Sequence, residues 1–349
     1  MTADRARNRR TAALLISGGV LLLLFFASFL FGRMPVPFAD VIRILAHRGW
    51  TAIGLDRVLP TPVTWTDTME KAVIEVRLPR IVMAMLVGCS LSAAGAAFQG
   101  VFQNPMASPD ILGASNGAAF GAALAILLGC SAKYITVFAF LGSILTVVLV
   151  FLVAQRAPGQ RTVNLILAGI MIGSLFSAGT SYLKLVADPT NQLPAITYWL
   201  LGSLSGTRLS AILPAAIPMA AGLVPLLLLR WRLNLLTLGD SEARALGVNT
   251  DLLRAALILS ATLVTAAAIS VSGVIGWVGL VIPHLSRKLV GSDNRGLLPC
   301  SMLTGAAFLL LVDNVSRNLL ATEIPIGILT AVIGAPFFIY LLLRKEKTL

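Results

Sequence analysis

Long runs of apolar residues, separated by short polar segments, constrain this chain more than any other feature. Of its 349 residues, 57% are hydrophobic and only 12% are charged, and the mean hydropathy is +0.89. A membrane hydrocarbon core of about 30 Å is crossed by roughly 20 apolar residues in a helix. No water solvates the backbone there, so a spanning segment must be a helix or part of a closed barrel. Because the runs are long and do not alternate, the sequence predicts an all-α polytopic membrane protein.

Ten runs are long enough to be membrane spans. The first follows four arginines and lacks a small-x-small cleavage site, so we predict an uncleaved span rather than a signal peptide. The boundaries within 252–290 stay open, because glycines and a proline interrupt the stretch "SVSGVIGWVGLVIPH". The predicted spans are 12–31, 81–99, 111–130, 134–154, 164–186, 211–229, 252–272, 274–290, 297–313 and 326–343.

The distribution of lysine and arginine predicts the orientation of these spans. With the N-terminus inside, the inner segments hold 16 of the 27 basic residues, as the positive-inside rule requires. Both termini are then cytoplasmic, which demands an even number of spans and agrees with ten. The net charge of +12 is accordingly a topology signal and not a nucleic-acid footprint. We interpret 1–349 as one transmembrane domain with these parts: a cytoplasmic N-terminus (1–11), a mostly external segment (32–80), a cytoplasmic loop (230–251) and a cytoplasmic tail (344–349).

Two segments of the chain share a sparse pattern of small residues. Four residues recur at a constant offset of 178 positions, with Ser92, Gly95, Pro105 and Gly113 matching Ser270, Gly273, Pro283 and Gly291. In the predicted topology the first copy runs inward and the second runs outward. The pattern therefore predicts an inverted repeat, an architecture common among transporters, although four matches among small residues also arise by chance.

The sequence holds no motif for catalysis, nucleotide binding or metal binding. It has no G-x-x-x-x-G-K-[ST] phosphate loop, no G-x-S-x-G and no H-E-x-x-H. The histidines and cysteines lie too far apart to suggest a metal site or a disulfide framework; they are His47, His284, Cys89, Cys130 and Cys300. We therefore expect that the chain is no enzyme and carries no metal or cofactor of its own.

The predicted spans contain almost no ionisable residues. Lys184, Asp313 and Arg317 approach spans, and all three are predicted near the outer ends. A proton- or sodium-coupled carrier usually keeps an acid, a histidine or a cation near the midplane, so a secondary carrier is disfavoured. The chain is expected to form a pathway that is either passive or driven by a partner.

One short polar segment, "GDSEARALGV" (239–248), lies in the most basic inner loop. Its residues suit a helix of under two turns: Asp240 or Ser241 as N-cap, Glu242 at the positive end, Gly247 as left-handed C-cap, and Asn249 or Thr250 as cap of the next helix. Such a helix is too short to be stable alone and needs something to pack against. The pattern by itself favours an ordinary surface loop.

A second polar stretch, "EVRLPR" (75–80), precedes the second predicted span. Pro79 suits the first turn of a helix, and Arg77 and Arg80 are three positions apart, so they should point to similar sides. Two interpretations stay open here. The arginines could snorkel to the interface and set the topology, or they could form a positive docking patch for an acidic partner.

Several long stretches together resemble the FecCD-type permeases, the membrane subunits of type II ABC importers for iron chelates, haem and cobalamin. The resemblance covers roughly residues 75–345. The matching stretches are "RLPR" (77–80), "LSAAGAAFQGVFQNPMASPDILGASNGA" (91–118), "LPAITYWLLGSLSG" (193–206), "GDSEARALGV" (239–248), "GVIGWVGLVIPHLSR" (273–287) and "EIPIGILTAVIGAPFFIYLL" (323–342).

This resemblance implies a fold, partners and a location. The chain would have ten transmembrane helices and pair with a second permease copy or a paralogue in a bacterial or archaeal plasma membrane. Two cytoplasmic ABC ATPases would hold the ATP and Mg²⁺, so that no cofactor binds this chain. An external substrate-binding protein would deliver the cargo, and membrane lipid would surround the spans.

The resemblance also implies roles for particular residues. The segment that couples to the ATPase would comprise Gly239, Asp240, Ser241, Glu242, Ala243, Arg244, Ala245, Leu246 and Gly247. Docking to the binding protein would involve Arg77, Arg80 and Arg317. The cytoplasmic gate would include Thr162 and Val163, where Val163 departs from the small polar residues that the family often has there. The segments 164–186 and 334–336 would line or support the pathway, and an Ala243→Trp substitution should obstruct ATPase assembly.

The resemblance favours a metal chelate, most of all an iron–siderophore complex, as cargo. Haem, cobalamin or an oxyanion such as molybdate are the alternatives for the same machine. The sequence does not decide the substrate, the choice between homodimer and heterodimer, or the role of 46–74.

Overall fold

The computed structural model describes residues 2–32, 34–54 and 62–343, and this part of the chain is helical throughout. The predicted tail 344–349 lies outside the described residues, and so does part of 46–74. The elements in chain order are α1 (Thr2–Ser28), α2 (Phe38–Ala52), α3 (Asp67–Lys71), the π-helix η1 (Ala72–Arg77), α4 (Leu78–Val101), the 3₁₀ turn η2 (Pro109–Leu112), α5 (Ala114–Leu127), α6 (Ala132–Arg156), α7 (Arg161–Val186), α8 (Gln192–Leu200), α9 (Leu209–Leu236), α10 (Asp240–Ala245), α11 (Thr250–Ser272), α12 (Val278–Val290), α13 (Asn294–Asn318) and α14 (Ile326–Leu343).

Each of the ten predicted spans overlaps one of these helices, which confirms an all-α polytopic membrane protein. Among the helices that overlap predicted spans, α5 and α14 are apolar but shorter than the others, and α12 has only 13 residues. The number of ten spans and the cytoplasmic termini therefore stay predictions. Seven described helices are long and apolar enough to cross a membrane: Asn8–Ser28, Asp67–Val101, Ala132–Arg156, Thr162–Val186, Leu209–Leu236, Thr250–Ser272 and Asn294–Asn318.

The helix of the second predicted span begins earlier than the hydropathy suggests. The side chain of Thr66 accepts a hydrogen bond from the Met69 N–H and caps α3, which continues through η1 into α4. Residues 67–80, which the sequence places in the external segment, thus belong to one helix that runs from Asp67 to Val101. The π-helical turn η1 within it ends at Arg77 and widens the helix there.

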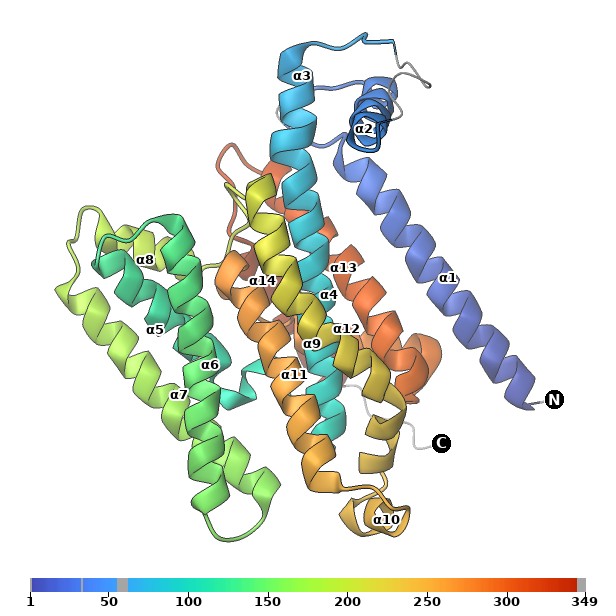
Figure 1. The fold of residues 1–349 in the computed structure, drawn as a ribbon, viewed down its shortest axis with the longest axis vertical. Helices are drawn as coiled ribbons and strands as arrows, with labels where there is room; N and C mark the ends of the chain where they lie inside the picture. The colour runs from blue at the N-terminus through green and yellow to red at the C-terminus, as the bar shows by residue number, and fades with distance from the viewer. Residues whose placement is uncertain (1, 33, 55–61, 344–349) are drawn as a thin grey trace.

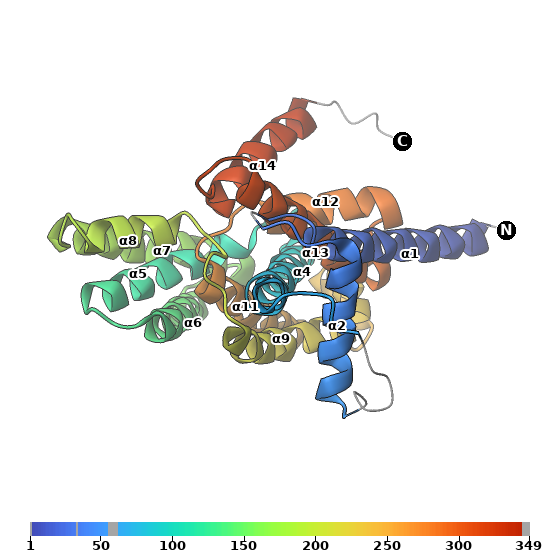
Figure 2. The ribbon, with the colours of Figure 1, turned by 90° about the horizontal axis from the view of Figure 1, so that it is seen from above.

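Helix α4 is the centre of the molecule. Of its most apolar window, 78% is buried, against 11% for α1 and 22% for α7. It packs against α9, α11, α12 and α13, which surround it when the molecule is viewed from above (Figure 2). Glycines permit this closeness: a Cβ on Gly88 would overlap the backbone of Gly305, and a Cβ on Gly95 would overlap the backbone of Gly279. Small residues at helix contacts are the usual means of tight packing in lipid.

Two groups of helices flank this centre (Figure 1). Helices α5, α6, α7 and α8 form one group, in which Gly117 and Gly121 of α5 lie against the backbone of α6. Helix α1 lies on the other side and packs mainly on α13. We call the end of the bundle that carries α10 the α10 end, and the opposite end, which carries α2 and α3, the α2 end. Helix α1 starts toward the α10 end and α4 starts at the α2 end (Figure 1).

The predicted repeat is not matched by the local backbone at two of its four residue pairs. Gly95 lies in the middle of α4 whereas Gly273 follows the end of α11, and Pro105 lies in a loop whereas Pro283 lies inside α12. At the other two pairs the backbone agrees, because Ser92 and Ser270 both lie in helices and Gly113 and Gly291 both have a positive φ, of +73° and +82°. The inverted repeat stays a prediction.

The close contact at Gly95 gives a first testable expectation. Gly95→Ala places a methyl group against the Gly279 backbone, so the two helices must separate, at a cost of about 1–3 kcal/mol or more. The thermal unfolding temperature in detergent should fall by several degrees. Gly18→Ala in α1, where nothing lies within 4 Å of the added Cβ, is the matched control and should leave this temperature unchanged or slightly raised. Equal behaviour of the two variants would contradict the tight contact.

Candidate functional site

The segment 239–247 forms the short helix α10 at the tip of the α10 end (Figure 1). The helix begins at Asp240 and its N-cap is Gly239, so the prediction that Asp240 or Ser241 is the N-cap is wrong. Glycine suits this place because φ is +116°. The C-cap is Leu246, and the predicted left-handed glycine, Gly247, follows it directly. Gly247 has φ +80°, its N–H donates to the Arg244 carbonyl at 2.9 Å, and the Val248 N–H donates to the Ala243 carbonyl at 3.1 Å.

Helix α10 is attached to the bundle by one face and is exposed on the rest. Ala243 is fully buried, and α10 contacts α9 and α11. An Ala243→Trp substitution would therefore disrupt this packing instead of presenting a bulky group to a partner, which corrects the expectation for that variant. The exposed residues are Ser241, Glu242, Arg244, Ala245 and Leu246.

Two polar contacts tie α10 to the start of α11. The Arg244 side chain donates to the Thr250 hydroxyl at 3.1 Å and lies 3.5 Å from the Asp251 carboxylate. The side chain of Asn249 accepts a hydrogen bond from the Leu252 N–H at 3.0 Å, which confirms it as the cap of the next helix. Hydrogen bonds from its own backbone N–H and from Ser241 hold the pKa of Glu242 below its usual value, so this carboxyl is charged at neutral pH. The exposed face is thus polar, with Leu246 as its large apolar residue.

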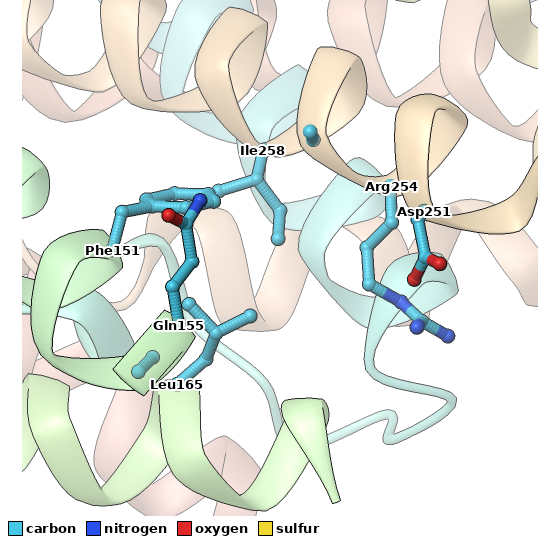
Figure 3. A pocket seen from close by; sticks show the side chains of 8 residues that line it. Phe151, Gln155, Leu165, Asp251, Arg254 and Ile258 are labelled. Carbon is cyan, nitrogen blue, oxygen red and sulfur yellow. The ribbon is translucent and has the colours of Figure 1, made fainter. Parts of the chain in front are cut away.

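A small pocket of about 70 Å³ lies beside this segment, between α11 and the neighbouring ends of α6 and α7. Figure 3 shows Asp251 and Arg254 of α11 on one side and Phe151 and Gln155 of α6 on the other. Leu165 of α7 completes this part of the wall. The pocket is large enough for a few waters at most, so it marks a loosely packed contact and not a cargo site.

The predicted gate residues, Thr162 and Val163, lie in the first turn of α7, close in sequence to Leu165 of that pocket. Val163 is exposed and Thr162 is half-buried. The side chain of Asn164 donates to the carbonyls of Ala157 and Pro158 and fixes the turn that leads into α7. The gate role of the two residues stays a prediction.

The three predicted docking arginines lie at the α2 end, and all are largely buried. Arg77 donates hydrogen bonds to the carbonyls of Phe29 and Met34 in the segment after α1. Arg80 bonds the Asp313 carboxylate at 2.8 Å and both oxygens of Glu323, at 2.9 and 2.8 Å. The two arginines thus bind different partners, and the expectation that they point to similar sides stays a prediction.

Arg317 completes a buried charge network with these residues. Its Nε lies 3.1 Å from the Asp313 carboxylate, whose side chain is fully buried, whereas the Glu323 side chain is 27% exposed. Asp313 therefore joins α4 to α13 through Arg80. Sequence reasoning missed this role because Arg80 and Asp313 are 233 positions apart. The one signal was an acid placed four residues before Arg317 near the end of an apolar run.

A second cavity, of about 290 Å³, lies at the α10 end between α4, α9, α12 and α13. Its wall is mostly polar and is formed by Gln99, Gly100, Gln103, Asn104, Pro105, Thr237, Arg287, Ser292, Asn294 and Leu297. Within the described residues, no group of three or more His, Cys, Asp or Glu side chains is arranged to hold a metal ion. Neither cavity contains a catalytic constellation in this part of the chain.

A model of the FecCD transport family matches residues 20–344. The chain belongs to this family. It is the permease subunit of an ABC importer, a multi-pass protein of the plasma membrane, and it is not an enzyme.

Relatives of this FecCD permease differ in cargo. The molybdate import system permease protein MolB of Haemophilus influenzae is 44% identical over 80% of this chain and 82% of its own length. The cobalamin import system permease protein BtuC of Halobacterium salinarum is 42% identical over 85% of this chain and 80% of its own length. An inward-facing structure of an ABC transporter assigned to the metal-chelate type superimposes with a TM-score of 0.82 at 39% identity, covering 94% of this chain and 98% of that one.

The α10 end of the FecCD permease is held together by a polar cluster around Asp293, the N-cap of α13. The Asp293 carboxylate accepts hydrogen bonds from Arg10 of α1, Asn234 of α9 and the Arg295 N–H, each between 2.8 and 2.9 Å. Burial raises the pKa of Asp293, but these hydrogen bonds and the charge of Arg10 bring its pKa below the usual value. The cluster thus joins three helices at the α10 end.

Removing the buried acid at the α2 end should destabilise the permease strongly. Asp313→Ala leaves Arg80 and Arg317 without their shared carboxylate, at a cost of about 3–5 kcal/mol. The thermal unfolding temperature in detergent should fall sharply. Arg43→Ala, which breaks the partly exposed ion pair with Asp40, is the control and should cost about 1 kcal/mol or less. A small effect of Asp313→Ala would show that the network contributes little.

The Asp293 cluster predicts a pH dependence. Because folding lowers the pKa of this carboxyl, its contribution is present above the ordinary carboxyl pKa of about 3.9 and is lost as the pH falls through the lower folded value. Asp293→Asn should be less stable than the wild type by about 1–2 kcal/mol at pH 7. Unfolding temperatures measured from pH 7 to pH 3 should show a constant gap down to about pH 5 that narrows below about pH 4. A gap that widened on acidification would contradict this sign.

Proposed function

We propose that this permease forms, as a homodimer, the pathway of a type II importer for a metal chelate, with an iron–siderophore complex as the favoured cargo. An external binding protein delivers the chelate at the α2 end, and two ATPases bind at the α10 end and hold the ATP and Mg²⁺. The observation that carries the proposal is α10, a polar helix attached to the bundle by buried Ala243 and otherwise exposed. A helix of this kind gives an ATPase something to hold without any change in the spans.

Movement of α10 has a direct route to the predicted gate. Arg244 connects α10 to Thr250 and Asp251 at the start of α11. Helix α11 in turn faces α6 and the start of α7 across the small pocket of Figure 3. Because that contact is loosely packed, a shift of α11 can displace the first turn of α7, which carries Thr162 and Val163, at low cost. We propose that this displacement opens and closes the pathway.

Helix α7 is the helix best suited to form the interface between the two copies. Only 22% of its most apolar window is buried within one copy. Four of its large apolar residues, at helical spacing, are more than half exposed: Leu167, Ile170, Met171 and Leu175. A second copy packed along α7 would enclose an apolar pathway, which α14 would also line or support. Among the described residues, this pathway would contain no ionisable group suited to binding a particular cargo. Selection would then rest with the binding protein.

The docking of that binding protein at Arg77, Arg80 and Arg317 is also proposed, with a condition set by the geometry. Arg80 is held by Asp313 and Glu323, and only Glu323 is partly exposed. A carboxylate on the binding protein must therefore compete with Glu323 for the Arg80 guanidinium. Charge complementarity of this kind affects the rate of association more than the final affinity.

Molybdate is the second candidate cargo. The molybdate permease of Haemophilus influenzae is 44% identical to this chain, so an oxyanion pathway needs few changes at the level of the fold. An uptake experiment decides between the iron–siderophore complex and molybdate. Proteoliposomes that contain the permease, the cognate ATPase and the binding protein are given ⁵⁵Fe-labelled siderophore or labelled molybdate, and the accumulated label is measured. Uptake by this chain alone, unaffected by ATP, would contradict the importer.

A substitution on the exposed face of α10 tests the coupling. Leu246 is 62% exposed, so Leu246→Glu should leave the fold intact while weakening ATPase binding at least tenfold, because it places a charge in an apolar contact. Leu128→Glu, at a residue 63% exposed at the far end of α5, is the matched control. Co-purification with the ATPase and ATP-driven uptake should both fall in the first variant only. Full uptake by Leu246→Glu would contradict the role of α10.

A further inference from the structure

Helix α2 (Phe38–Ala52) has no part in the function described so far. It follows α1 after a nine-residue connection and lies just beyond the end of α1, where Figure 1 looks down its axis. Seen from above, it runs crosswise to the long helices and extends beyond them on one side (Figure 2). A helix that runs crosswise to the spans, close to the end of one of them, is oriented as a helix parallel to the membrane surface would be.

One face of α2 is fixed to the protein. Val41 and Ile44 are fully buried in a cluster that includes Phe29, Trp65 and Val73. This anchoring gives α2 a defined orientation relative to the spans.

Ion pairs and hydrogen bonds strengthen the attachment on the polar side. Arg48 lies 2.6 Å from the Glu70 carboxylate, which also accepts a hydrogen bond from the Trp65 indole at 3.0 Å. Arg43 donates to Thr64 and to Asp40 at 2.9 and 3.3 Å. Both arginines thus connect α2 to the polar segment 62–71.

A further side of α2 carries exposed apolar residues. Phe38 and Ile42, four positions apart and hence on the same side of the helix, are 48% and 39% exposed. Leu30 and Phe31, in the segment that links α1 to α2, are 46% and 49% exposed. Helix α1 is long and apolar enough to cross a membrane and only 11% of its apolar window is buried, so its exposed side chains are suited to lipid. The exposed apolar residues of α2 thus lie close in the chain to a helix suited to face lipid.

We propose that α2 is an interfacial helix that inserts Phe38 and Ile42 into the membrane leaflet at the α2 end. An amphipathic helix in this position buries its apolar face about 5–10 Å into the boundary between headgroups and acyl chains, with its polar residues at the headgroups. The partner is therefore the lipid surface itself. Its effect is to hold the 62–77 segment, and with it the network at Arg77 and Arg80, at a set height above the membrane. The proposal does not depend on the cargo or on the ATPase.

Spin-label accessibility in a bilayer tests the proposal. The full chain, with Cys89, Cys130 and Cys300 replaced by alanine, receives one nitroxide at Phe38→Cys, Ile42→Cys or Arg43→Cys and is reconstituted in vesicles of phosphatidylethanolamine and phosphatidylglycerol. At 38 and 42, collisions with oxygen should exceed those with a water-soluble nickel chelate several-fold. At Arg43, the control on the polar side, the order should reverse.

Two results would overturn the proposal. Nickel accessibility at 38 and 42 equal to that at 43 would place the helix in water. Low accessibility to both reagents would show that a second copy or another protein covers it. If the cysteine-free chain does not fold, the unmodified chain in the same vesicles is treated with a bilayer-soluble carbene reagent and, separately, with hydroxyl radicals. Carbene labelling of the peptide that contains Phe38, with protection from hydroxyl radicals, supports insertion, and the opposite pattern contradicts it.

Discussion

The close approach of α4 to its neighbours is the contact on which the rest of the structure depends. Lipid gives helices no hydrophobic reason to associate, so they associate where small residues let backbones touch. Gly88 and Gly95 bring α4 against Gly305 of α13 and Gly279 of α12. These contacts make α4 a rigid centre. The parts that the proposed transport cycle requires to move, α10 and α7, accordingly lie away from it.

The two ends of the bundle are built in different ways. At the α2 end, buried charges join α4 to α13, and such a network holds one geometry because each charge left alone in the interior is costly. At the α10 end, a helix of six residues is attached by one buried alanine and two polar contacts. A rigid end suits the reception of a delivered cargo. An adaptable end suits a partner that changes shape during ATP hydrolysis.

The docking arginines illustrate the limit of local sequence reasoning. "EVRLPR" was compatible with an interfacial or a docking role, and both assume that the guanidinium groups face outward. Arg80 is instead bound by acids that lie 233 and 243 positions later in the chain. Neither the spacing of charged residues nor the hydropathy of the sequence reveals a contact between residues so far apart in the chain. The glycines 239 and 247 are the opposite case, since their positive φ follows from local helix-end geometry, and the glycine after the C-cap was predictable for that reason.

The sequence by itself determined the class of the fold. Runs of apolar residues force helices that cross the membrane, because an unpaired backbone group in lipid is too costly. It also indicated the glycine that follows α10, since the left-handed conformation of Gly247 is a local feature of a helix end. Only the tertiary structure decided that Ala243 faces the protein, that Asp313 lies beneath Arg80, and that α2 lies across the ends of the spans. Each of these depends on contacts between segments far apart in the chain, and such contacts arise only when the helices pack.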